Sequence, residues 1–308
     1  MTPVIETKNL SKWYGNVLGL SDVSLEIESG ITGLLGPNGA GKSTFMKLIT
    51  GQMKPNIGTV TIRGERVWND YRLFSRVGFC PEPDAFYEDV TGWEFLTGLL
   101  RFYGFTRAEA ADRASRALAI VELSGDKDRK VRSYSRGMRQ RVKFAQAIAH
   151  DPDVMILDEP FSGLDPLGKR RLIRLVKDFQ SEGRTVLVSS HVLPEIEAVT
   201  SRIIMIHQGK ILAQGDIHYI RDLIESHPHM ISLRSPAVRA VAAAFVDDAS
   251  ILKMTFGTDG RSLVVETHNR DAFFSRLQAV VVEKGIEVDE ITSPDDNLQA
   301  VFDYLVGK

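Results

Sequence analysis

The stretch from Gly36 to Thr44, GPNGAGKST, constrains this chain more than any other segment. It fits the spacing G-x-x-x-x-G-K-[ST], with Gly41, Lys42 and Ser43 near its end. The apolar run ITGLL directly precedes it and the helical pattern FMKLIT follows it, so we expect a strand, a tight loop and a helix in that order. A plain glycine-rich turn before a helix is the alternative. The full match in this context favours a phosphate-binding P-loop.

The residue types of this loop suit the phosphates of a nucleotide. Glycines let backbone N–H groups face a β-phosphate, and the helix N-terminus adds partial positive charge. We expect Lys42 to bridge the β- and γ-phosphates and Ser43 to offer its hydroxyl to Mg²⁺. The predicted nucleotide contacts of the loop are Gly36, Asn38, Gly39, Ala40, Gly41, Lys42, Ser43 and Thr44.

Two acids and a histidine follow two further strand candidates. Asp158 and Glu159 follow the apolar run VMIL, and His191 follows TVLVSS. Doubly wound sheets bind ligands at such strand ends. We expect Asp158 to hold Mg²⁺, directly or through water, Glu159 to polarise the attacking water as general base, and His191 to face the γ-phosphate. Solvated acids and a surface histidine are the alternatives, and the upstream P-loop favours the catalytic interpretation.

Alternating β-type runs and helical patterns over residues 1–225 predict an α/β domain. Between about residues 84 and 150 helical patterns such as GWEFLTGLLRFYG replace the strands, which predicts a helical insert. Two prolines in ESHPHMISLRSP mark a boundary near residues 226–236. The strand candidates of the first part are VIETKNL, DVSLEIE, ITGLLG, TVTIRG, VMILD and TVLVSS.

Residues 230–308 predict a small α+β accessory domain in the order β-α-β-β-α-β, closed by a helix over DNLQAVFDYLVG. This part contains no catalytic constellation. His227, His229 and His268 are scattered, and we expect them at the surface rather than as metal ligands. Self-association or a regulatory contact is the expected role.

Composition predicts a cytosolic globular protein. Hydrophobic residues make up 43% of the 308 and charged residues 25%, while the net charge of −2 gives no sign of a nucleic-acid partner. The single Cys80 excludes an internal disulfide. The start, MTPVIETKNLSKWYG, lacks an apolar signal core, and no apolar run approaches the roughly 20 residues of a membrane span. Any membrane role is therefore expected to go through a partner.

The motifs GPNGAGKST, YSRGM, VMILDEP, SGLD and SSH, in this order, resemble the nucleotide-binding subunit of an ABC transporter. The resemblance covers about residues 3–225. It implies a P-loop NTPase fold with a helical signature subdomain and a Mg-ATPase that works as a head-to-tail dimer. ATP would lie between the P-loop of one subunit and the signature of the other, and the second subunit can be the same chain or a different one.

The resemblance implies roles for residues outside the P-loop. Tyr14 matches the aromatic position that stacks on adenine, with Trp13 as a rival. Ser135 and Gly137 of the signature would contact the γ-phosphate held by the partner. The segment Ser162–Asp165 matches the D-loop, which crosses the dimer interface in that family.

Two departures from the family pattern concern the site. Glu82 stands where the family usually has a glutamine that contacts Mg²⁺, and a glutamate can still ligate the metal. In the signature, Arg136 replaces a glycine and Met138 replaces a glutamine. We expect Arg136 to point to solvent, and Arg139 and Arg141 to lie along the flank of the helix away from ATP.

The chain has one P-loop and one signature, so it cannot complete a site alone. ABC proteins of the translation type would show two copies of each motif, and those of the chromosome-maintenance type would have the two halves separated by a coiled coil. Neither feature is present, so both classes are excluded. The sequences of the signature and of the segment after Glu82 resemble those of exporter ATPases that work with a separate polytopic membrane permease. This implies a peripheral protein on the cytoplasmic side of the cell membrane, with the substrate chosen by the permease. The segment after Glu82 and the helix TGWEFLTGLL would form the groove in which this chain binds the permease. Phe86, Tyr87 and Trp93 are its anchors, or else core aromatics.

Two other functions are weighed against transport. An ATP-driven mechanical or regulatory subunit would move a membrane complex without transporting anything. A soluble P-loop kinase is disfavoured, because a kinase needs an acceptor site and has no use for a signature that completes a dimer.

Overall fold

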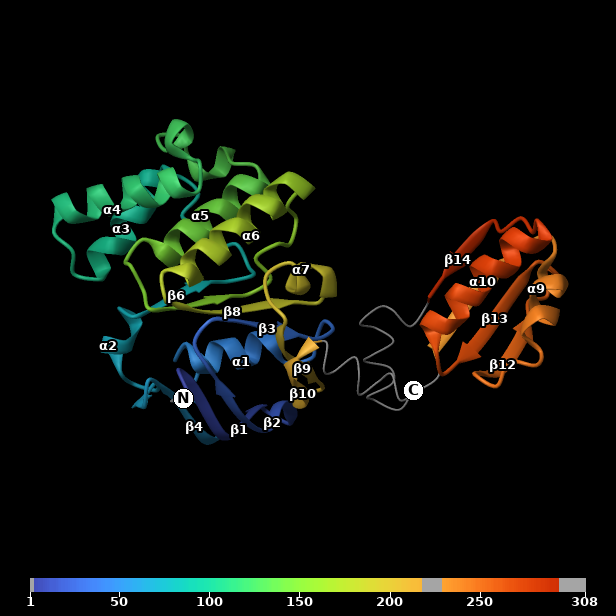
Figure 1. The fold of residues 1–308 in the computed structure, drawn as a ribbon. Coiled ribbons are helices and arrows are strands. Elements are labelled where there is room, and N and C mark those ends of the chain that lie inside the picture. Colours follow the sequence, from blue (N-terminus) through green and yellow to red (C-terminus); the bar gives the residue numbers. More distant parts are fainter. Residues whose placement is uncertain (1–2, 218–228, 294–308) are drawn as a thin grey trace. The chain divides into compact units, whose positions relative to one another are not determined.

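The computed structural model describes residues 3–217 and 229–293 (Figure 1). The chain divides into two compact units, Met1–Asp216 and Ile217–Lys308. The expected gap between domains, residues 226–229, falls almost wholly outside the described residues, so the limits 1–225 and 230–308 stay predictions. The helix expected over residues 296–307 lies outside them as well. No helix in the described ranges is both long and apolar enough to cross a membrane.

A six-stranded sheet in the order β10-β9-β3-β8-β7-β6 forms the centre of the first unit. Neighbouring strands are parallel from β9 to β6, and β10 is antiparallel to β9. All residues of β3, β7 and β8 are buried, as their continuous apolar runs predict. The strands are β3 (Ile31–Leu35), β6 (Val77–Cys80), β7 (Val154–Leu157), β8 (Thr185–Ser190), β9 (Arg202–His207) and β10 (Lys210–Asp216).

Three strands of this sheet, β6, β9 and β10, are absent from the sequence prediction. Strand β6 has four residues and includes a glycine, which weakens its β-signal. Strand β9 carries the apolar run Ile203–Ile206, but it pairs with the partly exposed β10 across a two-residue turn, Gln208–Gly209. This turn places Gln208 and Gly209 beside the P-loop.

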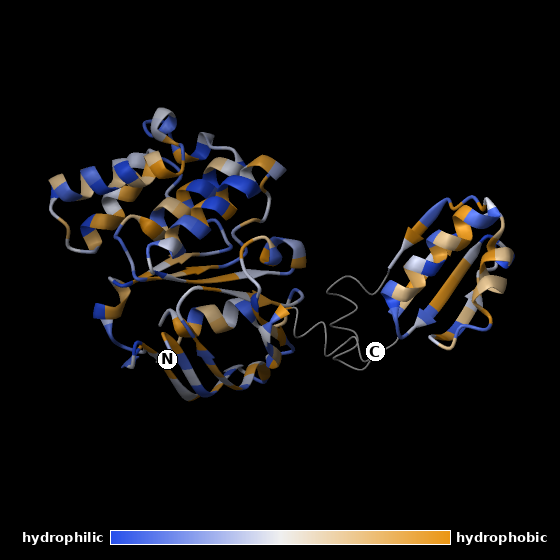
Figure 2. Cartoon of the chain, in the orientation of Figure 1, coloured by the Kyte–Doolittle hydropathy of each residue, from blue (hydrophilic) through white to orange (hydrophobic). Residues whose placement is uncertain are grey.

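A second, antiparallel sheet in the order β2-β1-β4-β5 completes the first unit. Helix α1 (Lys42–Ile49) lies between the two sheets (Figure 1), and its Phe45, Met46 and Ile49 are fully buried. Figure 2 shows apolar colours along the strands that face this helix. The strands are β1 (Ile5–Tyr14), β2 (Val17–Ile27), β4 (Ile57–Ile62) and β5 (Glu65–Arg66).

The predicted helical insert contains three helices, α3 (Gly92–Phe102), α4 (Arg107–Ile120) and α5 (Arg136–Ile148). Thr91 and Thr106 start α3 and α4 with reciprocal capping boxes, which satisfy N–H groups that a helix start leaves open. Helix α5 contacts β6 of the central sheet. The remaining helical elements are α2 (Tyr71–Phe74), η1 (Ser124–Asp126), η2 (Val131–Ser133), α6 (Pro166–Ser181) and α7 (Leu193–Glu197).

The second unit contains an antiparallel sheet in the order β12-β13-β11-β14. The described elements follow the expected β-α-β-β-α-β order. Phe245 and Phe273 meet in the core with ring centroids 4.7 Å apart. The elements are β11 (His229–Arg234), α9 (Val238–Phe245), β12 (Ile251–Phe256), β13 (Ser262–Thr267), α10 (Arg270–Lys284) and β14 (Glu290–Thr292).

Candidate active site

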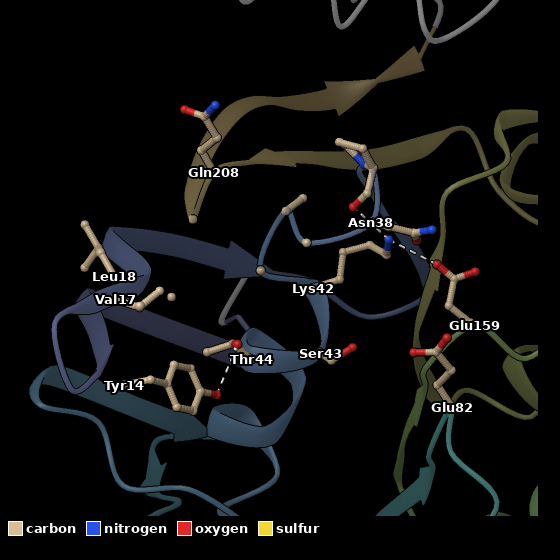
Figure 3. Close-up of a pocket in the computed structure, with 16 residues that line it drawn as sticks. Tyr14, Val17, Leu18, Asn38, Lys42, Ser43, Thr44, Glu82, Glu159 and Gln208 are labelled. Atoms are coloured by element: carbon tan, nitrogen blue, oxygen red, sulfur yellow. Dashed lines mark hydrogen bonds and ion pairs between the residues drawn. The ribbon is translucent and has the colours of Figure 1, made fainter.

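A pocket of about 660 Å³ opens over the start of α1, where the loop after β3 enters the helix (Figure 3). The end of β7 and the turn between β9 and β10 form other parts of its wall. The residues that line it are Tyr14, Val17, Leu18, Gly19, Pro37, Asn38, Gly39, Ala40, Gly41, Lys42, Ser43, Thr44, Glu82, Glu159, Gln208 and Gly209. The structure therefore brings the predicted P-loop together with the predicted Tyr14, Glu82 and Glu159.

The shape of the loop depends on Gly41, the N-cap residue of α1. Its φ of +109° is a backbone conformation that residues with a side chain rarely adopt. A Cβ at this position would lie 2.9 Å from the backbone oxygen of Gly19. The glycine thus permits both the turn into α1 and close packing of the loop on β2. The first N–H groups of α1 are left facing the pocket, without a side-chain cap. Gly36, the first residue of the motif, is not among the lining residues.

Lys42 and Glu159 form a buried ion pair at the pocket wall. The lysine Nζ lies 3.1 Å from Glu159 Oε1, and the two side chains are 6% and 5% exposed. Lys42 Nζ also donates to the backbone oxygen of Gly36 at 2.7 Å. Figure 3 shows the ammonium group between the loop and the carboxylate. The predicted phosphate ligand and the predicted base are therefore held together in this structure.

His191 holds the other oxygen of the same carboxylate. Its Nδ1 lies 2.9 Å from Glu159 Oε2, and its side chain is 45% exposed. Glu159 and His191 were each predicted to follow a strand. The two strands, β7 and β8, are parallel neighbours, so their ends lie close together. The carboxylate of Glu159 is thus oriented from two sides.

Asp158 is 2% exposed and points to a different partner from its neighbour. Its Oδ1 accepts a hydrogen bond from Ser189 Oγ at 2.8 Å, and its N–H donates to the backbone oxygen of Cys80. The carboxylate of Glu82 is exposed and lines the pocket, while its backbone oxygen accepts from Lys143 Nζ at 2.7 Å. Sequence analysis missed both Ser189 and Lys143.

The oxygen donors of this site fit Mg²⁺, which binds through one or two carboxylates together with substrate phosphates and water. Ser43 and Glu82 line the pocket that the P-loop forms, and Asp158, which is not a lining residue, directly follows β7. Within the described part of the chain, no group of three or more His, Cys, Asp or Glu side chains could hold a metal ion alone.

Tyr14 stands at the far end of the pocket from Glu159 (Figure 3), with its hydroxyl 3.2 Å from Thr44 Oγ1. Val17 and Leu18 provide apolar surface beside it. Trp13, the rival for adenine stacking, does not line the pocket. Val17 and Leu18, three and four residues after Tyr14, were not predicted as lining residues.

Gln208 and Gly209 are also lining residues that sequence analysis missed. They reach the P-loop because Gly209 N–H donates to the backbone oxygen of Ala40 at 2.8 Å. A partner so distant in sequence leaves no local pattern, so only the folded chain identifies this wall.

The signature residues Ser135 and Gly137 do not line the pocket. Ser135 caps α5, and its Oγ accepts from the N–H of Met138 at 3.2 Å. Arg136 is exposed, as expected, but its Nη2 also donates to Ser162 Oγ at 3.3 Å. The signature therefore contacts the segment Ser162–Asp165 within the same chain.

The other two arginines of the signature helix bind neighbouring elements. Arg139 holds both carboxylate oxygens of Glu88 at 2.6 and 2.8 Å, and this hydrogen bonding lowers the pKa of Glu88. Arg141 donates to the backbone oxygens of Val121 and Glu122 at the end of α4. The positive charge at the start of α5 thus has structural partners on the same chain.

The three aromatic residues expected in a permease groove have different surroundings. Phe86 is half-buried against Phe95, with ring centroids 5.2 Å apart, and Trp93 Nε1 donates to Ser115 Oγ. Tyr87 is 73% exposed. A separate pocket of about 300 Å³ has a partly aromatic wall; its lining residues are Thr50, Gln52, Phe74, Val77, Phe79, Tyr103 and Gln146.

The chain is similar to known proteins along its whole length. Residues 20–162 match the family described as "ABC transporter". The bacitracin transport ATP-binding protein BcrA of Bacillus licheniformis is 31% identical, with 100% of this chain and 98% of that protein aligned. The uncharacterized ABC transporter ATP-binding protein YcbN of Bacillus subtilis (strain 168) is 37% identical over 100% and 98% of the two chains. The Nod factor export ATP-binding protein I of Cupriavidus metallidurans is 34% identical over 72% of this chain and 74% of its own.

Solved structures share the fold of the first unit. An ATP-binding subunit of an ABC transporter superposes with a TM-score of 0.65 at 32% identity, covering 72% of this chain and 93% of that one. A dimeric ATP-binding cassette bound to ADP and Pi gives a TM-score of 0.63 at 26% identity, covering 69% and 98%.

Proposed function

The chain belongs to the family of ABC transporter ATP-binding subunits, and from this premise we propose that two copies, or one copy and a related subunit, hydrolyse Mg-ATP at shared sites and drive export through a separate membrane permease. ATP hydrolysis is the activity of the family.

The arrangement of Lys42, Glu159 and His191 carries the proposal. One buried carboxylate lies between an ammonium group and an imidazole at the wall of a P-loop pocket. The γ-phosphate of ATP attracts Lys42 because a triphosphate carries more negative charge than one carboxylate. Once Lys42 turns to the phosphates, Glu159 is free to accept a proton from the attacking water while His191 keeps its orientation.

Magnesium supplies charge neutralisation at the β- and γ-phosphates when it is bound. Ser43, Asp158 and Glu82 are the oxygen donors that would hold it, directly or through water. Glu82 adds a negative charge where the family usually has a neutral glutamine. We therefore assign Glu82 to the metal rather than to the phosphates, which a carboxylate repels.

The head-to-tail dimer is supported by the placement of the signature. Ser135 and Gly137 lie at the start of α5 and outside the pocket formed by their own chain. The start of a helix attracts phosphate through its free N–H groups and its dipole. We assign these residues to the nucleotide held by the partner, and the related cassette with ADP and Pi is described as a dimer.

Export through a permease is supported by the names of two relatives, which describe bacitracin transport and Nod factor export. We assign the chain to the cytoplasmic face of the membrane, held there by its permease. The pocket with Phe74, Phe79 and Tyr103 and the exposed ring of Tyr87 are the surfaces we assign to the permease contact.

The variant Glu159→Gln tests the assignment of the base. We expect it to bind Mg-ATP while hydrolysis falls by about 100-fold or more, since a positioned general base contributes roughly 10²–10⁴-fold. Because ATP is then not consumed, the dimer should persist and elute earlier in size-exclusion chromatography. Hydrolysis at the wild-type rate would show that another group accepts the proton.

A further inference from the structure

Ser189, the fifth residue of β8, holds both acids at the end of β7. Its hydroxyl donates to Asp158 Oδ1 at 2.8 Å and accepts the N–H of Glu159 at 2.9 Å. A hydroxyl can do both because it has one proton and two lone pairs. Ser189 is fully buried, and Asp158 and Glu159 are 2% and 5% exposed. Since the three residues share a dry environment, each of these bonds is stronger than its counterpart in water.

The backbone at Glu159 explains why its N–H needs this partner. Glu159 has φ +47°, a left-handed conformation that is unfavourable for a residue with a side chain. Asp158 N–H donates toward β6, to the backbone oxygen of Cys80, and the next N–H along the chain, that of Glu159, faces the opposite neighbour, β8, just beyond the pair Leu157 and Val188. The hydroxyl of Ser189 accepts this N–H and holds the turn that aims Glu159 at Lys42 and His191.

The neighbouring hydroxyls of β8 do not share this role. Ser190 Oγ donates to Glu195 and accepts from the N–H of Val192, so it serves the start of α7. Thr185, at the other end of the strand, is 1% exposed, and its hydroxyl makes no hydrogen bond among the described residues. Of the three hydroxyl residues of β8, Ser189 is therefore the one that binds Asp158 and Glu159.

We propose that Ser189 is a positioning residue for ATP hydrolysis: one hydroxyl orients the carboxylate of Asp158 toward the metal and fixes the backbone turn that places Glu159 for proton abstraction. The inference rests on the proposed roles of these two acids. It concerns a residue outside the pocket lining that acts through both acids.

The test compares Ser189→Ala with Ser189→Thr, which keeps the hydroxyl. Loss of a group that orients metal ligands typically costs 10- to 100-fold in activity or metal affinity. We expect Ser189→Ala to lower kcat by about 10- to 100-fold and to raise the Mg²⁺ concentration for half-maximal activity, with Ser189→Thr closer to wild type. Thr185→Val is the matched control, because it removes a buried hydroxyl of the same strand that binds no carboxylate; its kcat should stay unchanged.

Nucleotide binding supplies a readout that does not depend on turnover. Ser189 is not among the residues that line the nucleotide pocket, so Ser189→Ala should bind a non-hydrolysable ATP analogue normally without Mg²⁺. The gain in affinity on adding Mg²⁺ should shrink. Normal binding of the analogue without Mg²⁺ also shows that Ser189→Ala is folded. The test therefore remains valid even if the extra methyl group of Ser189→Thr does not fit the structure.

Three results separate this inference from the proposed function. Wild-type kcat and wild-type Mg²⁺ dependence in Ser189→Ala, with Glu159→Gln inactive, would overturn the positioning role alone. Equal loss of analogue binding with and without Mg²⁺ would also overturn it, because it would show a merely structural role. Full hydrolysis by Glu159→Gln would instead overturn the assigned base.

Discussion

One peptide unit separates Asp158 from Glu159, and the turn at Glu159 sends the two carboxylates to different partners. Asp158 binds the hydroxyl of Ser189, while Glu159 lies between Lys42 and His191. Two adjacent acids on one extended strand would point to opposite faces. The left-handed backbone at Glu159 ends this extended geometry, and Glu159 lines the pocket while Asp158 does not.

At the other end of the pocket, Tyr14 is expected to stack on adenine. Alanine substitution of an aromatic that stacks on a base costs about 1–3 kcal/mol, roughly 5- to 150-fold in Kd. We expect Tyr14→Ala to weaken ATP binding by that amount and Tyr14→Phe to have a small effect, as measured by titration with a fluorescent ATP analogue. Trp13→Ala is the control, because Trp13 lies outside the pocket lining. A larger loss for Trp13→Ala than for Tyr14→Ala would reverse the assignment.

At the scale of elements, α5 connects the signature to the segment after β6. Lys143 donates to the backbone oxygen of Glu82 and pairs with Asp84 at 3.0 Å, and its side chain is only 4% exposed. Arg139 binds Glu88 further along the same segment. The helix that starts with the signature thus also fixes the segment that carries Glu82.

The C-terminal end of α5 packs on the sheet through His150. Its ring stacks on Tyr103, 4.3 Å between centroids, and its Nε2 lies 3.2 Å from the backbone oxygen of Val77 in β6. Burial lowers the pKa of His150 to about 4. The histidine is therefore neutral in the folded protein at neutral pH.

This burial predicts a pH dependence of stability. The unfolded chain takes up the proton near pH 6.5, but the folded protein does so only near pH 4, so stability is complete above pH 6.5 and falls as the pH drops toward 4. We expect His150 to lower the free energy of unfolding by about 2 kcal/mol between pH 7.5 and pH 5, as measured by urea denaturation. His150→Gln should lack this component. An equal decrease in both proteins would show that other groups cause it.

At the scale of the whole molecule, the first unit carries both halves of the proposed site but does not bring them together. The P-loop pocket and the acids are on one side, and the signature lies outside that pocket. Two chains arranged head to tail would supply both halves twice, as closed symmetric dimers do.

Mixing two inactive variants tests this arrangement. Lys42→Ala damages the P-loop, and Ser135→Arg damages the signature. A mixed dimer has one intact site and one doubly damaged site, so the mixture should recover activity, up to about a quarter of the wild-type rate if the sites act independently. Steady-state ATPase assays of the mixture and of each variant alone decide the matter. Recovery would be absent if each chain completed its own site.

The sequence by itself determined the P-loop, the acids at the end of β7, His191 and the α/β class, because each of these depends on local spacing or on the apolar run beside it. Only the tertiary structure decided that Gly209 reaches Ala40 and that Ser189 joins Asp158 to Glu159. Ser189 is 31 residues from Asp158 in the sequence, and the register that pairs Leu157 with Val188 places the two side by side. Strand pairing between distant segments leaves no periodic pattern in either one, which is why these contacts could not be predicted.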